Sequence, residues 1–136
     1  MACYLAEALY ALDRYEESEQ WALRGMELGS KDDLATQVAG LSVRARLLAR
    51  KGETSAALAL AERADSLART TDCPWLQGDA ALDLAEVMYL TGDCSRATQT
   101  TQRAIECYQR NGATARIARA QRLTATWTPG GSPASG

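Results

Sequence analysis

Residues 45–64, ARLLARKGETSAALALAERA, carry apolar residues at helical spacing on both sides of a Gly-Glu turn. Leucines and alanines recur every three or four positions before Gly52 and again after it, which is the pattern of an amphipathic helix. Glycine commonly supplies the left-handed residue that ends a helix. The stretch therefore predicts two antiparallel helices joined by a short turn.

The same pattern occurs three times along the chain. Its turns contain Asp13-Arg14, Gly52-Glu53 and Gly92-Asp93, so the repeat spacing is 39 and then 40 residues. Small or apolar residues occupy equivalent positions around each turn: Ala6, Ala45 and Ala85; Leu9, Leu48 and Met88; Ser18, Ala57 and Ala97; Gly25, Ala64 and Ala104; Leu28, Leu67 and Cys107. A period in this range indicates stacked helical hairpins, and short side chains let the facing helices approach closely.

Capping signals divide the chain into seven predicted helices. They cover about residues 2–12, 15–29, 32–51, 53–70, 74–91, 93–110 and 113–127. Ser30 with Asp32 and Asp33, Asp93, and Pro74 after Asp72 are typical of helix starts, and Asn111-Gly112 is typical of a helix end. We expect one all-α domain over residues 1–127, with hairpins at about 2–29, 32–70 and 74–110 and a closing helix at 113–127. Residues 128–136 offer little that is apolar to bury and predict a disordered tail.

Composition narrows the partner classes. The chain has 136 residues, of which 46% are hydrophobic and 24% charged, and this balance is typical of a soluble globular domain. It holds no apolar run long enough for a membrane span and no secretion signal, so we expect a cytoplasmic protein without membrane contact. The net charge of −2 makes nucleic acid an unlikely partner, since nucleic-acid binders gather excess Lys and Arg.

Catalysis is not expected from these residues. The chain contains no histidine, which most catalytic zinc sites and Ser-His or Cys-His dyads require. Phosphate-binding glycine loops are absent from the sequence too. We therefore predict no enzyme activity, no catalytic residue, no metal and no cofactor. The cysteines Cys3, Cys73, Cys94 and Cys107 form no C-x-x-C pair and are expected to be buried small side chains, with a disulfide or a reactive thiol as the alternative.

Three segments resemble tetratricopeptide repeats: residues 6–22, AEALYALDRYEESEQWA; residues 45–64; and residues 82–106, LDLAEVMYLTGDCSRATQTTQRAIE. They differ from the family in their longer period, against 34 residues, and in lacking its closing proline. Residues 75–93, WLQGDAALDLAEVMYLTGD, are also similar to C-terminal repeats of large actinobacterial regulators that carry a nucleotide-binding switch and sometimes a cyclase domain. The resemblance implies a right-handed superhelix of about three hairpins with a C-terminal capping helix.

The resemblance also implies a binding surface. In tetratricopeptide arrays the first helix of each hairpin lines a concave groove. The equivalent positions in this chain are Glu7, Tyr10, Arg46, Arg50, Asp79, Asp83, Glu86 and Tyr89. Mixed charge and two tyrosines favour an extended or helical peptide as the ligand. The alternative is that these residues only solvate an exposed face and pair with one another.

Charge is distributed unevenly along the chain. Arg116, Arg119 and Arg122 recur every three residues in the last predicted helix, and no acidic residue follows residue 112. We predict a secondary basic stripe that meets an acidic partner, a neighbouring domain of the same polypeptide, or the acidic first hairpin of another copy. An ordinary polar capping face is the alternative.

The first predicted helix leaves an apolar flank that includes Leu5 and Leu9. A preceding repeat would cover it, so we expect a piece of a longer array that can form a homodimer through this flank. Together these features predict a non-catalytic regulatory module that binds a protein or peptide in its groove, within a larger bacterial regulator whose upstream domains are candidate partners. A small-ligand sensor domain is the alternative, and nucleic-acid binding through the basic stripe ranks third.

Overall fold

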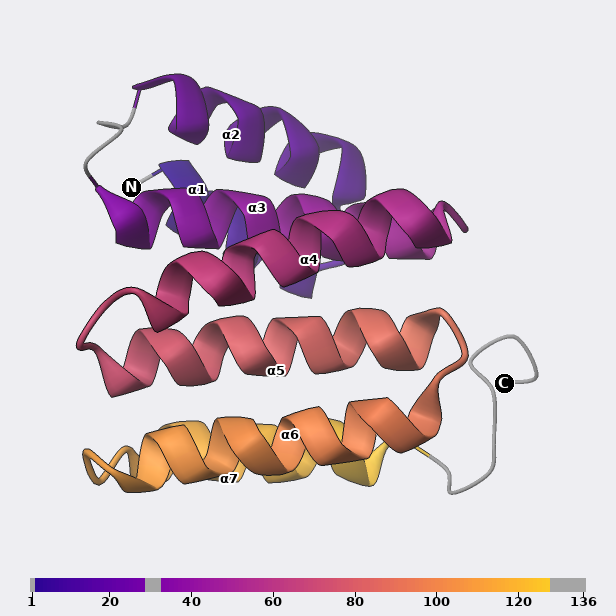
Figure 1. Ribbon diagram of the computed structural model, residues 1–136. Coiled ribbons are helices and arrows are strands. Elements are labelled where there is room, and N and C mark those ends of the chain that lie inside the picture. The colour runs from indigo at the N-terminus through magenta and orange to yellow at the C-terminus, as the bar shows by residue number, and fades with distance from the viewer. Residues whose placement is uncertain (1, 29–32, 128–136) are drawn as a thin grey trace.

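The computed structural model describes residues 2–28 and 33–127, with side chains from residue 5 onward, and these residues form helices and short connections without strands. The helices are α1 (Ala2–Ala11), α2 (Tyr15–Leu28), α3 (Leu34–Arg50), α4 (Thr54–Arg69), α5 (Pro74–Leu90), α6 (Cys94–Gln109) and α7 (Thr114–Ala125) (Figure 1). The all-α prediction is confirmed, and each predicted helix is present. Ser30, Asp32 and the predicted tail at 128–136 lie outside the described residues.

The turns at the repeated positions share one backbone geometry. Each places a residue in the left-handed region: Asp13 (φ 62°), Gly52 (φ 83°), Gly92 (φ 97°) and Gly112 (φ 67°). The following residue donates its N–H to the carbonyl five positions back: Arg14 to Leu9 at 2.9 Å, Glu53 to Leu48 at 3.0 Å, Asp93 to Met88 at 2.8 Å and Ala113 to Tyr108 at 3.0 Å. This bond satisfies a carbonyl of the last helical turn, and its recurrence confirms the turn positions expected from the repeat.

Side-chain caps act at two of the predicted helix starts. Asp33 accepts a hydrogen bond from the N–H of Thr36 at 3.2 Å, and Asp93 accepts one from Arg96 at 3.1 Å. At the start of α5, Pro74 occupies the first turn and Cys73 makes no side-chain cap. Proline suits this position because its missing N–H would have no helical partner there.

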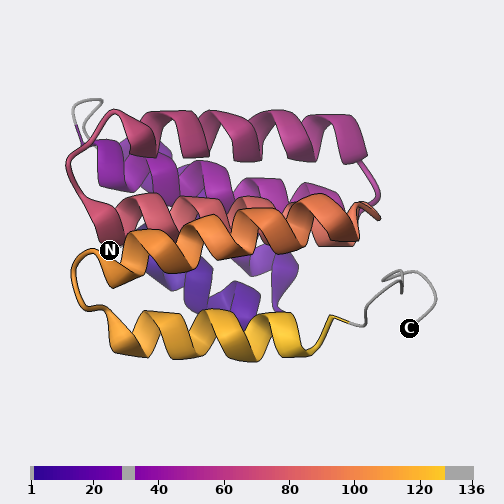
Figure 2. The same ribbon diagram turned by 60° about the horizontal axis from the view of Figure 1, so that its bottom comes forward.

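Consecutive helices pack against each other, α1 on α2, α3 on α4, α5 on α6, and α6 on α7. Helix α3 also contacts α1 and α5, so α3 lies between these two odd-numbered helices. Helix α7 runs beneath α6 and leads to the C-terminal end (Figure 2). Residues of α1, α3, α5 and α7 together line one cavity.

Small residues sit where the paired helices cross. The repeated alanines Ala6, Ala45 and Ala85 are fully buried, as are Ser18, Ala57 and Ala97 at the next equivalent position. The Ser18 hydroxyl donates to the carbonyl of Ala6 at 2.7 Å, which satisfies its one polar group inside the first pair of helices. The predicted close-approach positions are therefore confirmed.

One repeated apolar position departs from the expectation. Leu28, aligned with Leu67 and Cys107, is 75% exposed because it is the last residue of α2 and no described helix covers it. Of the apolar flank expected on the first helix, Leu5 is exposed, whereas Leu9 is buried. Leu12 and Leu23 are exposed as well.

The cysteines were expected to be buried, and of Cys73, Cys94 and Cys107 the structure confirms this for Cys107. Cys73 and Cys94 are half-buried, and Cys73 and Cys107 carry free thiols. Cys3 lies in α1, but its side chain is not among those that the structure describes.

Among the described helices, none combines the length and the apolar character needed to cross a bilayer.

Candidate ligand-binding cavity

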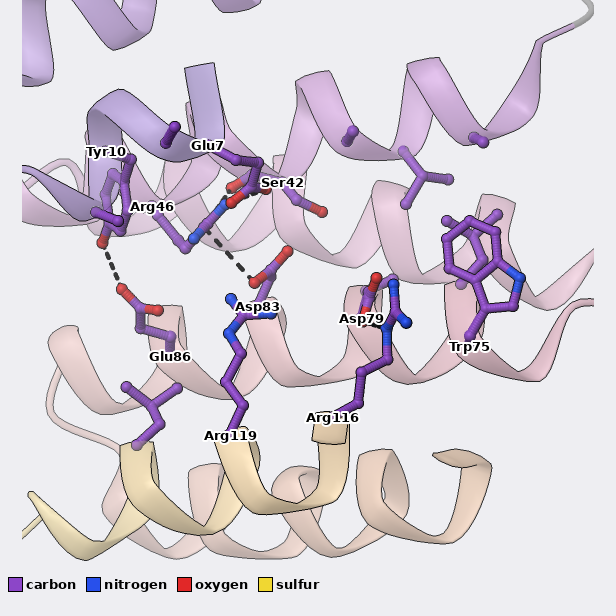
Figure 3. A pocket seen from close by; sticks show the side chains of 18 of the residues that line it. Glu7, Tyr10, Ser42, Arg46, Trp75, Asp79, Asp83, Glu86, Arg116 and Arg119 are labelled. Carbon is purple, nitrogen blue, oxygen red and sulfur yellow. Dashed lines mark hydrogen bonds and ion pairs between the residues drawn. The ribbon is translucent and has the colours of Figure 1, made fainter. Parts of the chain in front are cut away.

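A cavity of about 750 Å³ lies between α1, α3, α5 and α7 (Figure 3). Seven of the eight predicted groove residues line it: Glu7, Tyr10, Arg46, Arg50, Asp79, Asp83 and Glu86. The predicted basic stripe, Arg116, Arg119 and Arg122, also lines it. Two surfaces expected to be separate are thus facing walls of one cavity.

Tyr89 is the predicted groove residue that does not line the cavity. Its ring stacks on Trp127, with centroids 4.7 Å apart, beside a smaller pocket of about 410 Å³. At 3.6 residues per turn, Tyr89 points roughly 80° away from the stripe formed by Asp79, Asp83 and Glu86. Helical phase therefore removes it from the cavity wall.

Arg46 occupies the centre of the polar wall. Its side chain is 2% exposed, and Nη2 donates to Glu7 Oε1 at 2.5 Å while Nε lies 3.7 Å from Asp83 Oδ1. Nε also donates to the backbone carbonyl of Ser42 at 3.3 Å, and the guanidinium lies 4.4 Å from the centre of the Tyr10 ring. Burial opposes the charge, but the facing Asp83, Glu7 and Glu86 carboxylates raise the pKa of Arg46 well above its ordinary value.

Tyr10 links this wall to the next charged pair. Its hydroxyl donates to Glu86 Oε2 and accepts from Arg50 Nε at 2.7 Å. Arg50 Nη2 lies 3.6 Å from the same Glu86 oxygen. Burial, together with the neighbouring Glu86 charge, raises the pKa of Tyr10. The phenol therefore stays protonated and acts as a donor to Glu86.

Asp83 is the carboxyl group with the most altered acidity. Burial raises the pKa of Asp83 to about 8, against the opposing effect of Arg46, and the charges of Glu7, Glu86 and Asp79 add to the increase. Near neutral pH its carboxyl is largely protonated, so it presents a hydrogen-bond donor to the cavity. Asp83 and Glu7 both face the Arg46 guanidinium.

The wall on α7 differs from the others. Arg116 donates from Nε to Asp79 Oδ1 at 3.2 Å, and its guanidinium lies 5.2 Å from the Trp75 ring centre. Asp79 also accepts from the Tyr108 hydroxyl at 2.6 Å. Arg119 and Arg122 are exposed, line the cavity, and form no hydrogen bond or ion pair with any residue in the described ranges 5–28 and 33–127. Cationic groups without a partner are thus concentrated on one wall.

Several lining residues, among them Val38 and Ser42, were missed in the sequence. Val38 and Ser42 share one face of α3 with the predicted Arg46 and Arg50 at intervals of four positions, and all four line the cavity. That i, i+4 spacing was the available signal. The Ser42 hydroxyl is buried and has no hydrogen-bond partner among the described side chains and backbone. Trp75 and Leu76, at the start of α5, complete an apolar end of the cavity with Val38.

These groups can hold a polar ligand through ion pairs and hydrogen bonds while an apolar portion rests against Trp75. Within the described residues, no cluster of three metal-ligating side chains is present. No protein family, curated protein or solved structure matches this chain.

Proposed function

We propose that this chain is a non-catalytic interaction module that binds a peptide, or a segment of a neighbouring domain, in the cavity between α1, α3, α5 and α7. The supporting observation is convergence: side chains from four helices that are far apart in the sequence meet around about 750 Å³. That volume lies within the roughly 300–1,000 Å³ of ligand sites in proteins.

The cavity residues divide into two roles under this proposal. Glu7, Tyr10, Arg46, Arg50 and Glu86 bind one another and hold α1, α3 and α5 in place. They therefore shape the cavity. For these five residues, the alternative that the predicted groove residues pair with one another applies. The ligand would be recognised by the cavity groups that can still form hydrogen bonds or ion pairs.

We further propose a tetratricopeptide-like right-handed superhelix of three hairpins capped by α7, serving as the regulatory part of a larger bacterial protein. The recurring turn bond and the buried alanines at matching positions support this arrangement. A preceding repeat, or a second copy of the chain, would cover the exposed Leu12 and Leu28.

Blocking the cavity tests the proposal. Ala39 on α3 lines the cavity and is half-buried, so Ala39→Phe fills it, whereas Ala59→Phe on the exposed side of α4 is the matched control. Both proteins are titrated into fluorescein-labelled random heptapeptide pools, and binding is followed by anisotropy. We expect Ala39→Phe to abolish binding and Ala59→Phe to preserve it. Equal binding by the two variants, each with an unchanged circular dichroism spectrum, would refute the cavity assignment.

A small-ligand sensor is the second candidate, and the volume of the cavity favours it. A metabolite that binds only the folded chain raises its melting temperature. The sensor would be selected over the peptide module by two results together. The chain would bind no peptide pool, and a small molecule would stabilise the wild type and Ala59→Phe but not Ala39→Phe.

A further inference from the structure

The carboxylates around the cavity already have partners. Glu7 pairs with Arg46 at 2.5 Å, Glu86 binds Tyr10 and Arg50, and Asp79 binds Tyr108 and Arg116. Asp83 is buried beside Arg46, and because its pKa is raised to about 8 it adds little negative charge near neutral pH. Each of these four carboxyl groups therefore already interacts with an arginine or a tyrosine of the chain.

Two of the three arginines on the α7 wall differ from these groups. Arg119 and Arg122 have no partner among the described residues, and α7, TARIARAQRLTA, contains no acid that could neutralise them from its own helix. Figure 3 shows Arg119 extending from α7 toward the side chain of Asp83, across the cavity. An anion entering here would meet two guanidinium groups that have no partner among the described residues, and their charge would attract it.

The apolar end of the cavity adds a second requirement. Trp75, Leu76 and Val38 line it, and Arg116 lies over the Trp75 ring. One turn along α3 from Val38, the buried Ser42 hydroxyl lacks a hydrogen-bond partner among the described groups. A ligand matched to the whole cavity therefore carries an apolar group for Trp75 and an anionic group for α7.

The geometry points to an acidic peptide segment as the ligand, with a carboxylate held between Arg119 and Arg122 and a neighbouring apolar side chain against Trp75, Leu76 and Val38. Arginine favours carboxylates because its planar fork donates two parallel hydrogen bonds. A peptide can offer both groups at side-chain spacing, and a segment of a partner protein supplies them together. This inference rests on the proposed function and specifies the chemistry of its ligand.

Two fluorescein-labelled heptapeptide pools test it with the full chain. Both pools carry Leu, Phe or Trp at alternate positions; the acidic pool carries Asp or Glu between them, and the neutral pool carries Asn or Gln. We expect the acidic pool to bind roughly tenfold more tightly or better, as a charge-assisted hydrogen bond allows. The preference should weaken as salt rises.

Paired substitutions locate the preference. Arg119→Gln with Arg122→Gln should remove it, whereas Arg119→Lys with Arg122→Lys should keep part of it, because the charge remains and the planar fork is lost. Arg63→Gln is the matched control, since Arg63 is exposed on α4 and does not line the cavity. An unchanged preference in the double glutamine variant would overturn the role of Arg119 and Arg122.

The outcomes separate this inference from the proposed function. Equal binding of both pools, abolished by Ala39→Phe, would refute the acidic ligand and leave the peptide module intact. If neither pool binds, the peptide module fails as well. Stabilisation by citrate alone, lost in the double glutamine variant, would in that case assign the cavity to small carboxylates and overturn the peptide as ligand.

Discussion

Arg116 of α7 donates a hydrogen bond from Nε to Oδ1 of Asp79 on α5 at 3.2 Å. Asp79 belongs to the predicted groove and Arg116 to the predicted basic stripe, 37 positions later in the chain. Their contact brings α7 against the cavity, so that Arg119 and Arg122, one and two helical turns further on, line it as well.

Arg116→Gln should loosen α7 without unfolding the domain. The pair is partly exposed, with side-chain exposures of 45% for Arg116 and 27% for Asp79, so its loss should cost less than about 1 kcal/mol of unfolding free energy. Hydrogen exchange followed by mass spectrometry should show faster exchange in α7 and unchanged exchange in α3. Arg63→Gln on α4 is the control. Unchanged exchange in α7 would show that apolar packing on α6 alone holds the helix.

Arg46 should prove far more important for stability than Arg50. Arg46→Met removes a cation that is 2% exposed and leaves Glu7 facing a buried wall without it, so we expect a loss of about 3–5 kcal/mol. Arg50→Met is the matched control: its side chain is 38% exposed, and it should lose about 1 kcal/mol or less. Urea unfolding followed by circular dichroism measures both. Similar losses for the two variants would contradict the central position of Arg46.

Stability should decrease as pH rises from about 4 to about 8. The Asp83 carboxyl has an ordinary pKa of 3.8 and a folded pKa of about 8, because of burial first and of the nearby Glu7, Glu86 and Asp79 charges second, with Arg46 opposing. In this window the folded chain holds a proton that the unfolded chain has released, so rising pH favours unfolding by at most about 1.4 kcal/mol per pH unit.

The comparison with Asp83→Asn isolates this effect, because the amide keeps the shape of the protonated carboxyl and does not titrate. Urea unfolding of both proteins at intervals between pH 4.5 and pH 8.5 should give a steeper decline for the wild type. Parallel curves would mean that Asp83 is ionised in the folded state throughout this range.

Gly92→Ala should destabilise the α5–α6 turn through the backbone alone. Gly92 has φ 97°, and a Cβ added there would meet no atom within 4 Å, so the cost of about 1–2 kcal/mol comes from the left-handed conformation. Gly92→Asn should cost less, since asparagine tolerates this region better. Thermal unfolding of both variants tests the ranking, and an alanine variant as stable as the wild type would refute it.

Gly78→Ala should destabilise the folded chain for a steric reason. A Cβ at Gly78 would lie 2.6 Å from Cδ1 of the buried Tyr108 ring on α6, so we expect a loss of about 1–3 kcal/mol from overpacking. Shortening the opposing side chain in Gly78→Ala with Tyr108→Leu should give a combined loss smaller than the sum of the single losses. Additive losses would show that the two residues do not compete for the same space.

Helical boundaries and turns were predictable from the sequence because their causes are local. The apolar spacing around Gly52 and the acidic cap at Asp93 act within a few residues of the helix ends that they determine. The helical face of the cavity was also accessible through the spacing of Ser42 and Arg46, although Tyr89 shows that nearness to a turn is a poor guide to which way a side chain points.

The tertiary structure decided which charged side chains are buried and which of them form ion pairs. The same residue type, arginine, is nearly inaccessible at position 46 and is exposed at position 119, where no described residue pairs with it. The difference arises because Arg46 lies where α1, α3 and α5 meet, whereas Arg119 reaches the cavity from α7, a single helix at its edge. Short-range signals in the sequence determined the helices and their repeat. Long-range packing alone decided which charges neutralise one another and which remain to meet a ligand.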